Sequence, residues 1–328
     1  MRRRDFIIFA GGLVPALPFA SHAQEAKRIP VIGVLWHAAD AEAEGPYFKA
    51  LAEGFHDLGY VQGRNILFEH RFPNETPERF RAMAAELVSL KPDVLVSVGV
   101  AAAPYLKSAT TTIPLVFTLV ADPIGMKLVD NLARPSGNTT GLSTVGTDLA
   151  GKRFELLKEI VPGISRVALL INPNERTSLT YVSEGHSAAA KLGLGLDMFE
   201  ASTQDELPPA FSAMASAGTQ ALLIPGGGLF FQARVTVAKL GLTHRIPICV
   251  WSRESLEAGA LLSYGPDYIS IVRRASVYVD KILKGTRPSD LPVEQPTRFQ
   301  FLINQKTATT LGLDVPSYLQ QLADEVIE

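Results

Sequence analysis

Cysteine is almost missing from this chain: Cys249 is the only one among 328 residues. A single cysteine excludes an intrachain disulfide and a cysteine-based metal cluster. Cys249 lies inside the apolar run 246–250, which predicts a buried strand. We therefore expect an inert thiol in the core rather than a reactive one.

Long apolar runs and strong net charge are missing too. After residue 23 no segment reaches the roughly 18 uninterrupted apolar residues of a membrane helix, so we expect no stable membrane insertion of the mature chain. The formal net charge is only −2, which argues against the strongly basic surface of a nucleic-acid partner. Hydrophobic residues make up 47% and charged residues 20% of the chain, which is typical of a globular protein rather than a disordered one.

The common cofactor and catalytic motifs are lacking as well. Gly33 lies alone inside the first predicted strand, which therefore carries no Gly-x-Gly-x-x-Gly. The glycines at 226–228 follow a strand, but no Lys-Ser/Thr pair follows them, which excludes a P-loop. We also find no nucleophile elbow around a serine and no His-x-x-x-His pair. These absences predict no cofactor, no metal and no catalytic residues. An exported Rossmann-like enzyme remains an alternative, because such lobes host many functions.

The first 23 residues have the layout of an export signal. Three arginines at 2–4 precede an uncharged run at 6–20, and small residues lead to a cleavage site near Ala23. The paired arginines favour the twin-arginine route, but Arg2 stands where Ser or Thr is usual, so the general secretory route stays open. Removal of three Arg and one Asp leaves a mature net charge of about −4. The export signal does not end at a cysteine that could carry a lipid anchor. We therefore expect a soluble periplasmic protein.

The rest of the chain alternates short β-branched runs with longer stretches of helical period. Such alternation indicates parallel sheets covered on both faces, because parallel strands need a crossover helix. Turn-forming residues at 133–138 separate two series of similar length. We therefore predict an α/β fold with two Rossmann-like lobes. The strands are expected at 30–36, 65–69, 93–98 and 115–118, and then at 166–171, 194–199, 220–224 and 246–250.

The end of the chain does not simply extend the second series. A strand at 261–266, one long helix and a late strand at 298–303 are typical of a chain that crosses back between lobes. We place hinge strands near Leu142, Leu262 and Phe301, which gives three crossovers. The predicted division is an export signal at 1–23, an N-terminal lobe at 30–142 plus 265–298, and a C-terminal lobe at 143–264 plus 299–328.

Ligands of open parallel sheets bind beyond the carboxyl ends of the strands. This rule selects twelve candidate ligand-binding residues from the loops that follow the predicted strands. They are Trp36, His37, Gly99, Val100, Ala101, Ala121, Asp122, Asn172, Asn174, Gly226, Trp251 and Tyr264.

These residue types suggest different contacts. The loop that starts at Gly99 could cradle an anion with backbone N–H groups, or it could be an ordinary tight turn. Asp122 could pair with a ligand amine at the cleft or only cap a helix that begins after Pro123. Trp36, Trp251 and Tyr264 could stack on a ligand or pack in the core. His37 could contact the ligand, and the asparagines at 172 and 174 could lie on the cleft rim or simply form a turn.

Several short runs form a specific pattern together, although each is weak alone. One is Pro-Ser-Gly-Asn-Thr-Thr-Gly-Leu at 135–142; the others lie at 113–118, 121–125, 257–267, 279–285, 291–296 and 323–325. Together they resemble the ABC-transporter substrate-binding proteins of the tryptophan/tyrosine-binding type. The resemblance covers the mature chain and implies the type I periplasmic-binding-protein fold, a small-molecule ligand and an ABC permease in the inner membrane.

One departure from that family concerns the ligand. Family members often carry an acidic residue after the second-lobe strand at the place of Gly226, which implies a roomier or less amine-selective pocket here. We expect the solute-binding component of an importer, which closes its hinge around an amino acid, an aromatic acid or another small carboxylate. A ligand sensor for a membrane receptor would share this cleft and remains the main alternative.

Overall fold

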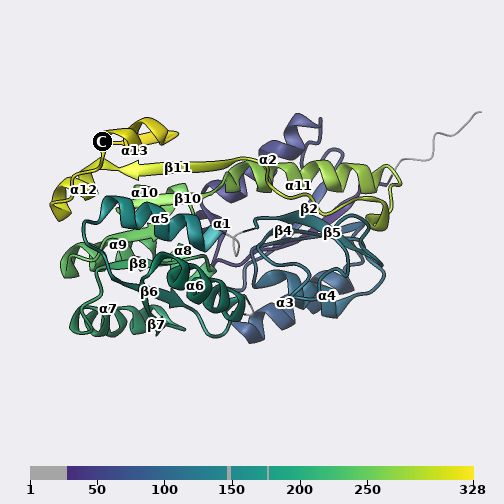
Figure 1. The fold of residues 1–328 in the computed structure, drawn as a ribbon. Coiled ribbons are helices and arrows are strands. Elements are labelled where there is room, and N and C mark those ends of the chain that lie inside the picture. The colour runs from purple at the N-terminus through teal and green to yellow at the C-terminus, as the bar shows by residue number, and fades with distance from the viewer. Residues whose placement is uncertain (1–27, 146–148, 176) are drawn as a thin grey trace, which may run out of the picture.

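The computed structural model describes residues 28–145, 149–175 and 177–328. They form two lobes side by side, each built on one β-sheet with helices on both faces (Figure 1). The expected α/β class with two Rossmann-like lobes is confirmed. The predicted export signal at 1–23 lies outside the described residues. Within the described ranges, none of the helices is long and apolar enough to cross a membrane.

The first lobe is built on five parallel strands in the order β2-β1-β3-β4-β5. The central strand β3 is buried along its whole length, because helices cover both of its faces: Val94, Val96 and Val98 join one hydrophobic cluster and Leu95 joins another. The strands are β1 (Val31–Leu35), β2 (Leu67–Arg71), β3 (Val94–Val98), β4 (Leu115–Val120) and β5 (Thr139–Ser143).

Two helices that are distant in sequence pack closely on this first sheet. The helices of the lobe are α1 (Ala41–Glu44), α2 (Pro46–Asp57), α3 (Pro77–Ser89), α4 (Ala102–Ala109) and α11 (Tyr268–Leu283). In α2, Gly54 allows the approach of α11, since a Cβ there would overlap the carbonyl oxygen of Arg273. The Tyr60 hydroxyl also donates a hydrogen bond to Asp280 Oδ1 at 2.9 Å. The late helix α11 thus belongs to the first lobe.

The second lobe is built on seven strands in the order β12-β11-β10-β9-β8-β6-β7. One pair departs from the predicted parallel arrangement: β10 and β11 are antiparallel, because the chain returns from the first lobe before it forms β11. The strands are β6 (Arg166–Ile171), β7 (Gly195–Glu200), β8 (Ala221–Leu223), β9 (Ile248–Val250), β10 (Leu262–Pro266), β11 (Phe299–Asn304) and β12 (Glu325–Ile327).

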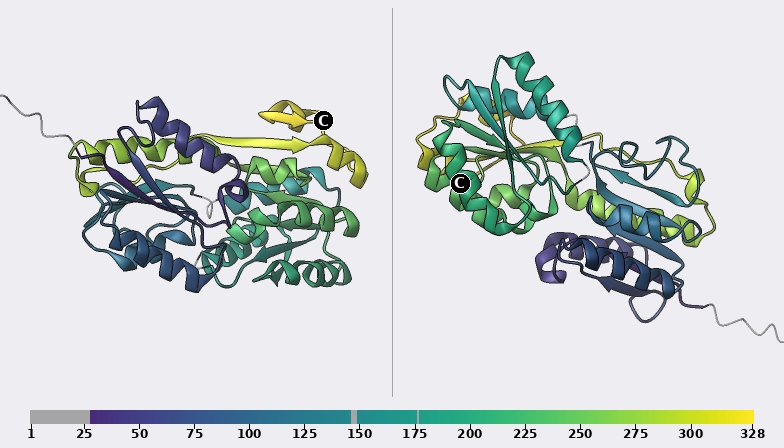
Figure 2. Two further views of the ribbon diagram at one scale, coloured as in Figure 1. Left: turned by 180° about the vertical axis from the view of Figure 1, so that it is seen from behind. Right: turned by 90° about the horizontal axis from the view of Figure 1, so that it is seen from below.

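Helices again cover both faces of this second sheet (Figure 2). They are α5 (Ala150–Ile160), α6 (Ser178–Leu192), α7 (Leu207–Ser216), α8 (Gly228–Gln232), α9 (Arg234–His244), α10 (Arg253–Glu257), α12 (Gln305–Leu311) and α13 (Ser317–Leu322). Cys249 on the central strand β9 is fully buried, and burial raises the pKa of its thiol to about 12. The expected inert core thiol is therefore present.

The chain crosses between the lobes three times, as predicted: after β5, after β10 and before β11. The first and third crossings run beside each other, since the Ser143 amide donates to the Glu294 carbonyl at 2.8 Å. The second crossing follows Pro266, because Gly265 and Pro266 still pair within the second sheet. These three short crossings bring the carboxyl ends of both sheets to face each other.

Candidate functional site

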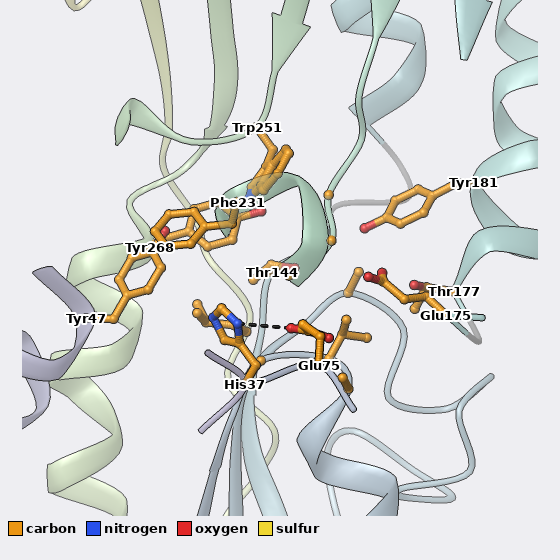
Figure 3. A pocket seen from close by; sticks show the side chains of 18 residues that line it. His37, Tyr47, Glu75, Thr144, Glu175, Thr177, Tyr181, Phe231, Trp251 and Tyr268 are labelled. Carbon is orange, nitrogen blue, oxygen red and sulfur yellow. Dashed lines mark ion pairs between the residues drawn. The ribbon is translucent and has the colours of Figure 1, made fainter. Parts of the chain in front are cut away.

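A cavity lies between the two lobes where the strand ends meet (Figure 3). It is partly open to solvent and is lined by residues of both lobes. Both lobes contribute side chains, so the complete cavity exists only while the lobes are close together. The lining residues are His37, Tyr47, Glu75, Gly99, Val100, Ala101, Leu119, Ala121, Thr144, Glu175, Thr177, Tyr181, Gly226, Gly227, Gly228, Phe231, Trp251 and Tyr268.

Seven of the twelve predicted residues meet at this cavity. They are His37, Gly99, Val100, Ala101, Ala121, Gly226 and Trp251. Asn172 and Asn174 instead line a wider groove, which shares Glu75 and Glu175 with the cavity. The strand-end rule therefore placed most candidates at the correct edge of each sheet.

Trp36 and Tyr264 do not reach the cavity, and the expected stacking by these two rings is corrected here. Trp36 has no exposed surface; its Nε1 donates to His70 Nδ1 at 3.0 Å and its ring lies parallel to Phe72. Successive residues of an extended chain point to opposite sides, so Trp36 packs inside the lobe while His37 faces the cleft. Tyr264 stacks on Phe299 within the second lobe, with ring centroids 6.1 Å apart.

Asp122 also lies away from the lining residues. Its Oδ1 accepts a hydrogen bond from the Gly125 amide at 2.8 Å. This contact stabilises a turn that follows Pro123, where the sequence analysis had expected a helix. The structure therefore assigns Asp122 to the turn rather than to a ligand amine.

Glu75 is an acidic residue that the sequence analysis missed. It follows β2 in a turn where Asn74 and Glu75 both have positive φ angles, 55° and 51°. This conformation is strained for residues other than glycine. Backbone hydrogen bonds hold the turn: Asn74 and Glu75 donate to the carbonyls of Ala38 and His37, each at 3.0 Å. The strained turn directs the Glu75 carboxylate into the cleft beside His37 (Figure 3).

Glu175, in the loop after β6, is the second missed acid and comes from the other lobe. Both carboxylates lie against the glycines at 226–228: a Cβ on Gly227 would stand 2.9 Å from Glu175 Oε1, and one on Gly228 would overlap Glu75. Burial and then repulsion from Glu75 raise the pKa of Glu175 to about 8. Glu175 thus places an acidic group beside Gly227, next to the glycine for which the resemblance implied a roomier or less amine-selective pocket.

His37 links Glu75 to a further buried glutamate. Its Nδ1 lies 3.1 Å from Glu75 Oε1 and its Nε2 lies 3.3 Å from Glu44 Oε2. Glu44 is fixed in turn by the amides of His37 and Ala38, at 2.9 and 2.7 Å. Burial disfavours the imidazolium, but Glu44 and the two cavity glutamates outweigh this effect and raise the pKa of His37 to about 9. His37 is thus a cation whose charge is already matched within the first lobe.

Aromatic rings form the other wall of the cavity (Figure 3). Tyr47 from α2 stacks on Phe231 from α8, with centroids 5.0 Å apart and planes at 24°. Trp251 and Tyr268 complete this wall. The Tyr47 hydroxyl also donates to Glu254 Oε2 of the second lobe at 3.3 Å. The wall is therefore assembled from both lobes.

The arrangement suits a ligand with a positive group and a flat apolar group. Glu175 Oε1 is shielded from solvent and completes no hydrogen bond, whereas Glu75 Oε1, also shielded, faces His37 Nδ1 at 3.1 Å. Such carboxylate oxygens are favourable acceptors for an ammonium group. Thr177 adds a buried hydroxyl without a partner. Among the described residues, no group of His, Cys, Asp and Glu is arranged to hold a metal ion.

Three relatives share most of this chain. A tyrosine-binding protein of Clostridioides difficile is 26% identical over 291 residues, which covers 89% of this chain and 82% of that protein. The structure of an ABC domain in complex with L-Trp from Streptococcus pneumonia is 27% identical, with a TM-score of 0.84 over 91% of this chain and 99% of that one. A conserved domain protein of Vibrio cholerae is 28% identical, with a TM-score of 0.85 over 90% and 99% of the two chains.

The family model described as ABC transporter substrate binding protein matches residues 28–327, which include both lobes, all three crossings and every residue of the cavity. This match agrees with the two-lobed fold and with a cavity lined by both lobes. The chain belongs to the family of ABC transporter substrate-binding proteins.

Proposed function

We propose that this protein captures an aromatic amino acid in the periplasm and delivers it to an ABC permease. The observation that carries the proposal is the meeting of Glu75 and Glu175, from opposite lobes, beside one aromatic wall. A ligand ammonium between these carboxylates would satisfy both shielded oxygens. Its ring would lie against Phe231 and Trp251.

The carboxylate of such a ligand requires donors at a different part of the cavity. The amides of Val100 and Ala101 lie where α4 begins, and the hydroxyls of Thr144 and Thr177 line the same space. Backbone amides at the start of a helix favour negative charge. We therefore place the carboxylate near these groups, which keeps the anion-binding role expected for the Gly99 loop.

We expect the ligand to close the two lobes because its contacts come from residues of both. A ligand shifts a conformational equilibrium only through contacts that differ between the two states. Glu75 and Tyr47 belong to the first lobe, whereas Glu175 and Phe231 belong to the second. An ammonium and a ring that touch both sets bind the closed form better than the open one. The closed form would then present both lobe surfaces to the permease.

The names of two relatives support this ligand class: one binds tyrosine and another was solved with L-Trp. Calorimetry with four related compounds tests the class directly. We expect L-tyrosine or L-tryptophan to bind at micromolar affinity or better, which corresponds to about 8 kcal/mol. We expect tyramine to bind more weakly, and 3-(4-hydroxyphenyl)propionate, which lacks the amine, to bind weakest. Equal affinity for the compound without an amine would overturn the assignment.

The transport role and the location require separate experiments. Mass spectrometry of the protein from a periplasmic extract should show a chain that begins after Ala23. Uptake of the radiolabelled ligand by cells that lack this protein should fall and should return when it is restored. Normal uptake together with a lost chemotactic or signalling response would instead indicate a sensor.

A further inference from the structure

Four titratable side chains meet at one end of the cavity. His37, Glu44 and Glu75 all belong to the first lobe, where His37 Nε2 lies 3.3 Å from Glu44 Oε2 and His37 Nδ1 lies 3.1 Å from Glu75 Oε1. Glu175 belongs to the second lobe and joins them only on closure. Closure therefore brings Glu175 and Gly228 of the second lobe against Glu75 and His37, whereas the contacts among His37, Glu44 and Glu75 lie within one lobe.

The structure places Glu175 close to Glu75, with both carboxylates largely removed from solvent. The two carboxylates lie against the neighbouring residues Gly227 and Gly228; both Oε1 atoms are shielded from solvent, and that of Glu175 has no hydrogen-bond partner. Two like charges in such a space cannot both stay ionised at low cost. The nearby His37 does not resolve this, because its charge is already shared between Glu44 and Glu75.

We propose that closure of the lobes requires one additional positive charge between Glu75 and Glu175, which a ligand ammonium supplies or which, in the empty protein, a proton on Glu175 supplies. The part that concerns the ligand rests on the proposed function. The part that concerns the proton does not, since it needs only the two carboxylates. The empty protein is thus closed by acid and opened by base.

The direction of this effect follows from linkage. In the open form Glu175 faces water and has an ordinary carboxyl pKa, whereas in the closed form its pKa is raised to about 8. The closed form therefore binds one more proton between about pH 4.5 and pH 8. Across that range each fall of one pH unit favours the empty closed form by about tenfold.

Other titratable groups lie near the surfaces that meet on closure, and their contribution to the pH dependence follows from their pKa values. Tyr181 from α6 lies beside Gly226, and burial keeps its pKa far above neutrality, so it stays un-ionised. Glu254 from α10 meets the Tyr47 hydroxyl across the lobes, and burial raises its pKa too. Glu254 therefore adds an effect of the same sign. Arg176 lies outside the described residues.

The test is small-angle X-ray scattering of the mature protein without ligand between pH 5 and pH 9. We expect the radius of gyration to be smaller at pH 5 than at pH 9. Glu175→Gln removes the ionisable group and keeps its shape, so this variant should stay compact at pH 9. Glu75→Gln should have the same effect from the other lobe and serves as a second variant if the first does not fold.

Two controls complete the experiment. Glu155→Gln changes an exposed acid of α5 and should follow the unmodified protein at every pH. Glu254→Gln removes the contribution of Glu254 to the pH dependence. The radius of gyration of this variant should still vary with pH by most of the original amount. A radius that does not vary with pH, or one that varies equally in Glu175→Gln, would overturn the proposal. Either result leaves the ligand assignment untouched, because no ligand is present; failure of the calorimetry would leave the scattering result untouched.

Discussion

The Glu75 carboxylate of the first lobe occupies the position that a Cβ on Gly228 of the second lobe would need. His37 Nδ1 lies 3.1 Å from the same position. These contacts join residues that are far apart in sequence and that meet only when the lobes close. The absence of a side chain at position 228 is therefore a requirement of the closed form and not of either lobe alone.

Gly228→Ala should weaken ligand binding with little change in the stability of the ligand-free protein. The added methyl group would force the Glu75 carboxylate aside, and overpacking of this kind costs about 1–3 kcal/mol, or about 5- to 150-fold in affinity. Calorimetry and thermal unfolding measure the two quantities. Gly151→Ala, on α5 with open space around it, is the matched control and should leave affinity unchanged.

Two aromatic side chains, Phe231 in the cavity wall and Trp36 in the core of the first lobe, lead to opposite expectations for ligand binding. Phe231→Ala removes part of the ring wall that includes Trp251 and should weaken an aromatic ligand by about 10- to 100-fold, since a buried aromatic side chain contributes roughly 1.5–3 kcal/mol. Trp36→Phe alters only the core of the first lobe and should lower stability without changing affinity. Titration calorimetry of both variants would contradict the assignment if Trp36→Phe lost more affinity than Phe231→Ala.

Asp122→Ala should leave affinity within about twofold, the range of substitutions away from a site. The variant loses the hydrogen bond to the Gly125 amide, and loss of a comparable helix cap costs about 1 kcal/mol. Denaturant unfolding should therefore show a small destabilisation. A tenfold loss of affinity for an amine ligand would instead return Asp122 to the binding site.

His70 should make the first lobe sensitive to acid. Burial lowers its pKa to about 4, below the ordinary value near 6.5, and its Nδ1 must stay unprotonated to accept the Trp36 N–H. The folded protein therefore binds fewer protons than the unfolded chain, so stability is complete above about pH 6.5 and falls by roughly 3 kcal/mol towards pH 4.

Chemical unfolding at a series of pH values measures this loss. His70→Gln keeps a hydrogen-bond acceptor but cannot titrate, so its stability should vary less between pH 4 and pH 6.5. His186→Gln, at an exposed position of α6, is the control and should behave like the unmodified protein. An unchanged slope in His70→Gln would show that another group takes up the proton.

Much of the fold was predictable because it depends on local patterns. The continuous apolar run at 30–36 indicated a strand buried on both faces, and the structure forms β1 there and buries four of its five residues. The isolated helix α11 between two late strands indicated a return crossing, and it packs on the first lobe. The antiparallel β10–β11 pair was not predicted, because the sequence of a strand does not state the direction of its neighbour.

The candidate site was predictable only in part, for a physical reason. The rule that ligands bind at strand ends identified His37, the Gly99 loop and Trp251. It did not identify Glu75 or Glu175, because each lies in a polar turn like many others in the chain. It also did not show that His37 faces the cleft whereas Trp36 packs inside the lobe. Which of two adjacent side chains faces the cleft depends on the exact end of the strand.

The sequence by itself determined the secondary structure, the two parallel sheets and the edge of each sheet where a ligand can bind, because these follow from hydrophobic periodicity and from the connection rules of parallel strands. Only the tertiary structure decided which acids meet. Glu75 is aimed by a strained turn, and Glu175 comes from the other lobe. Their proximity arises from hinge closure, which no local sequence pattern predicts.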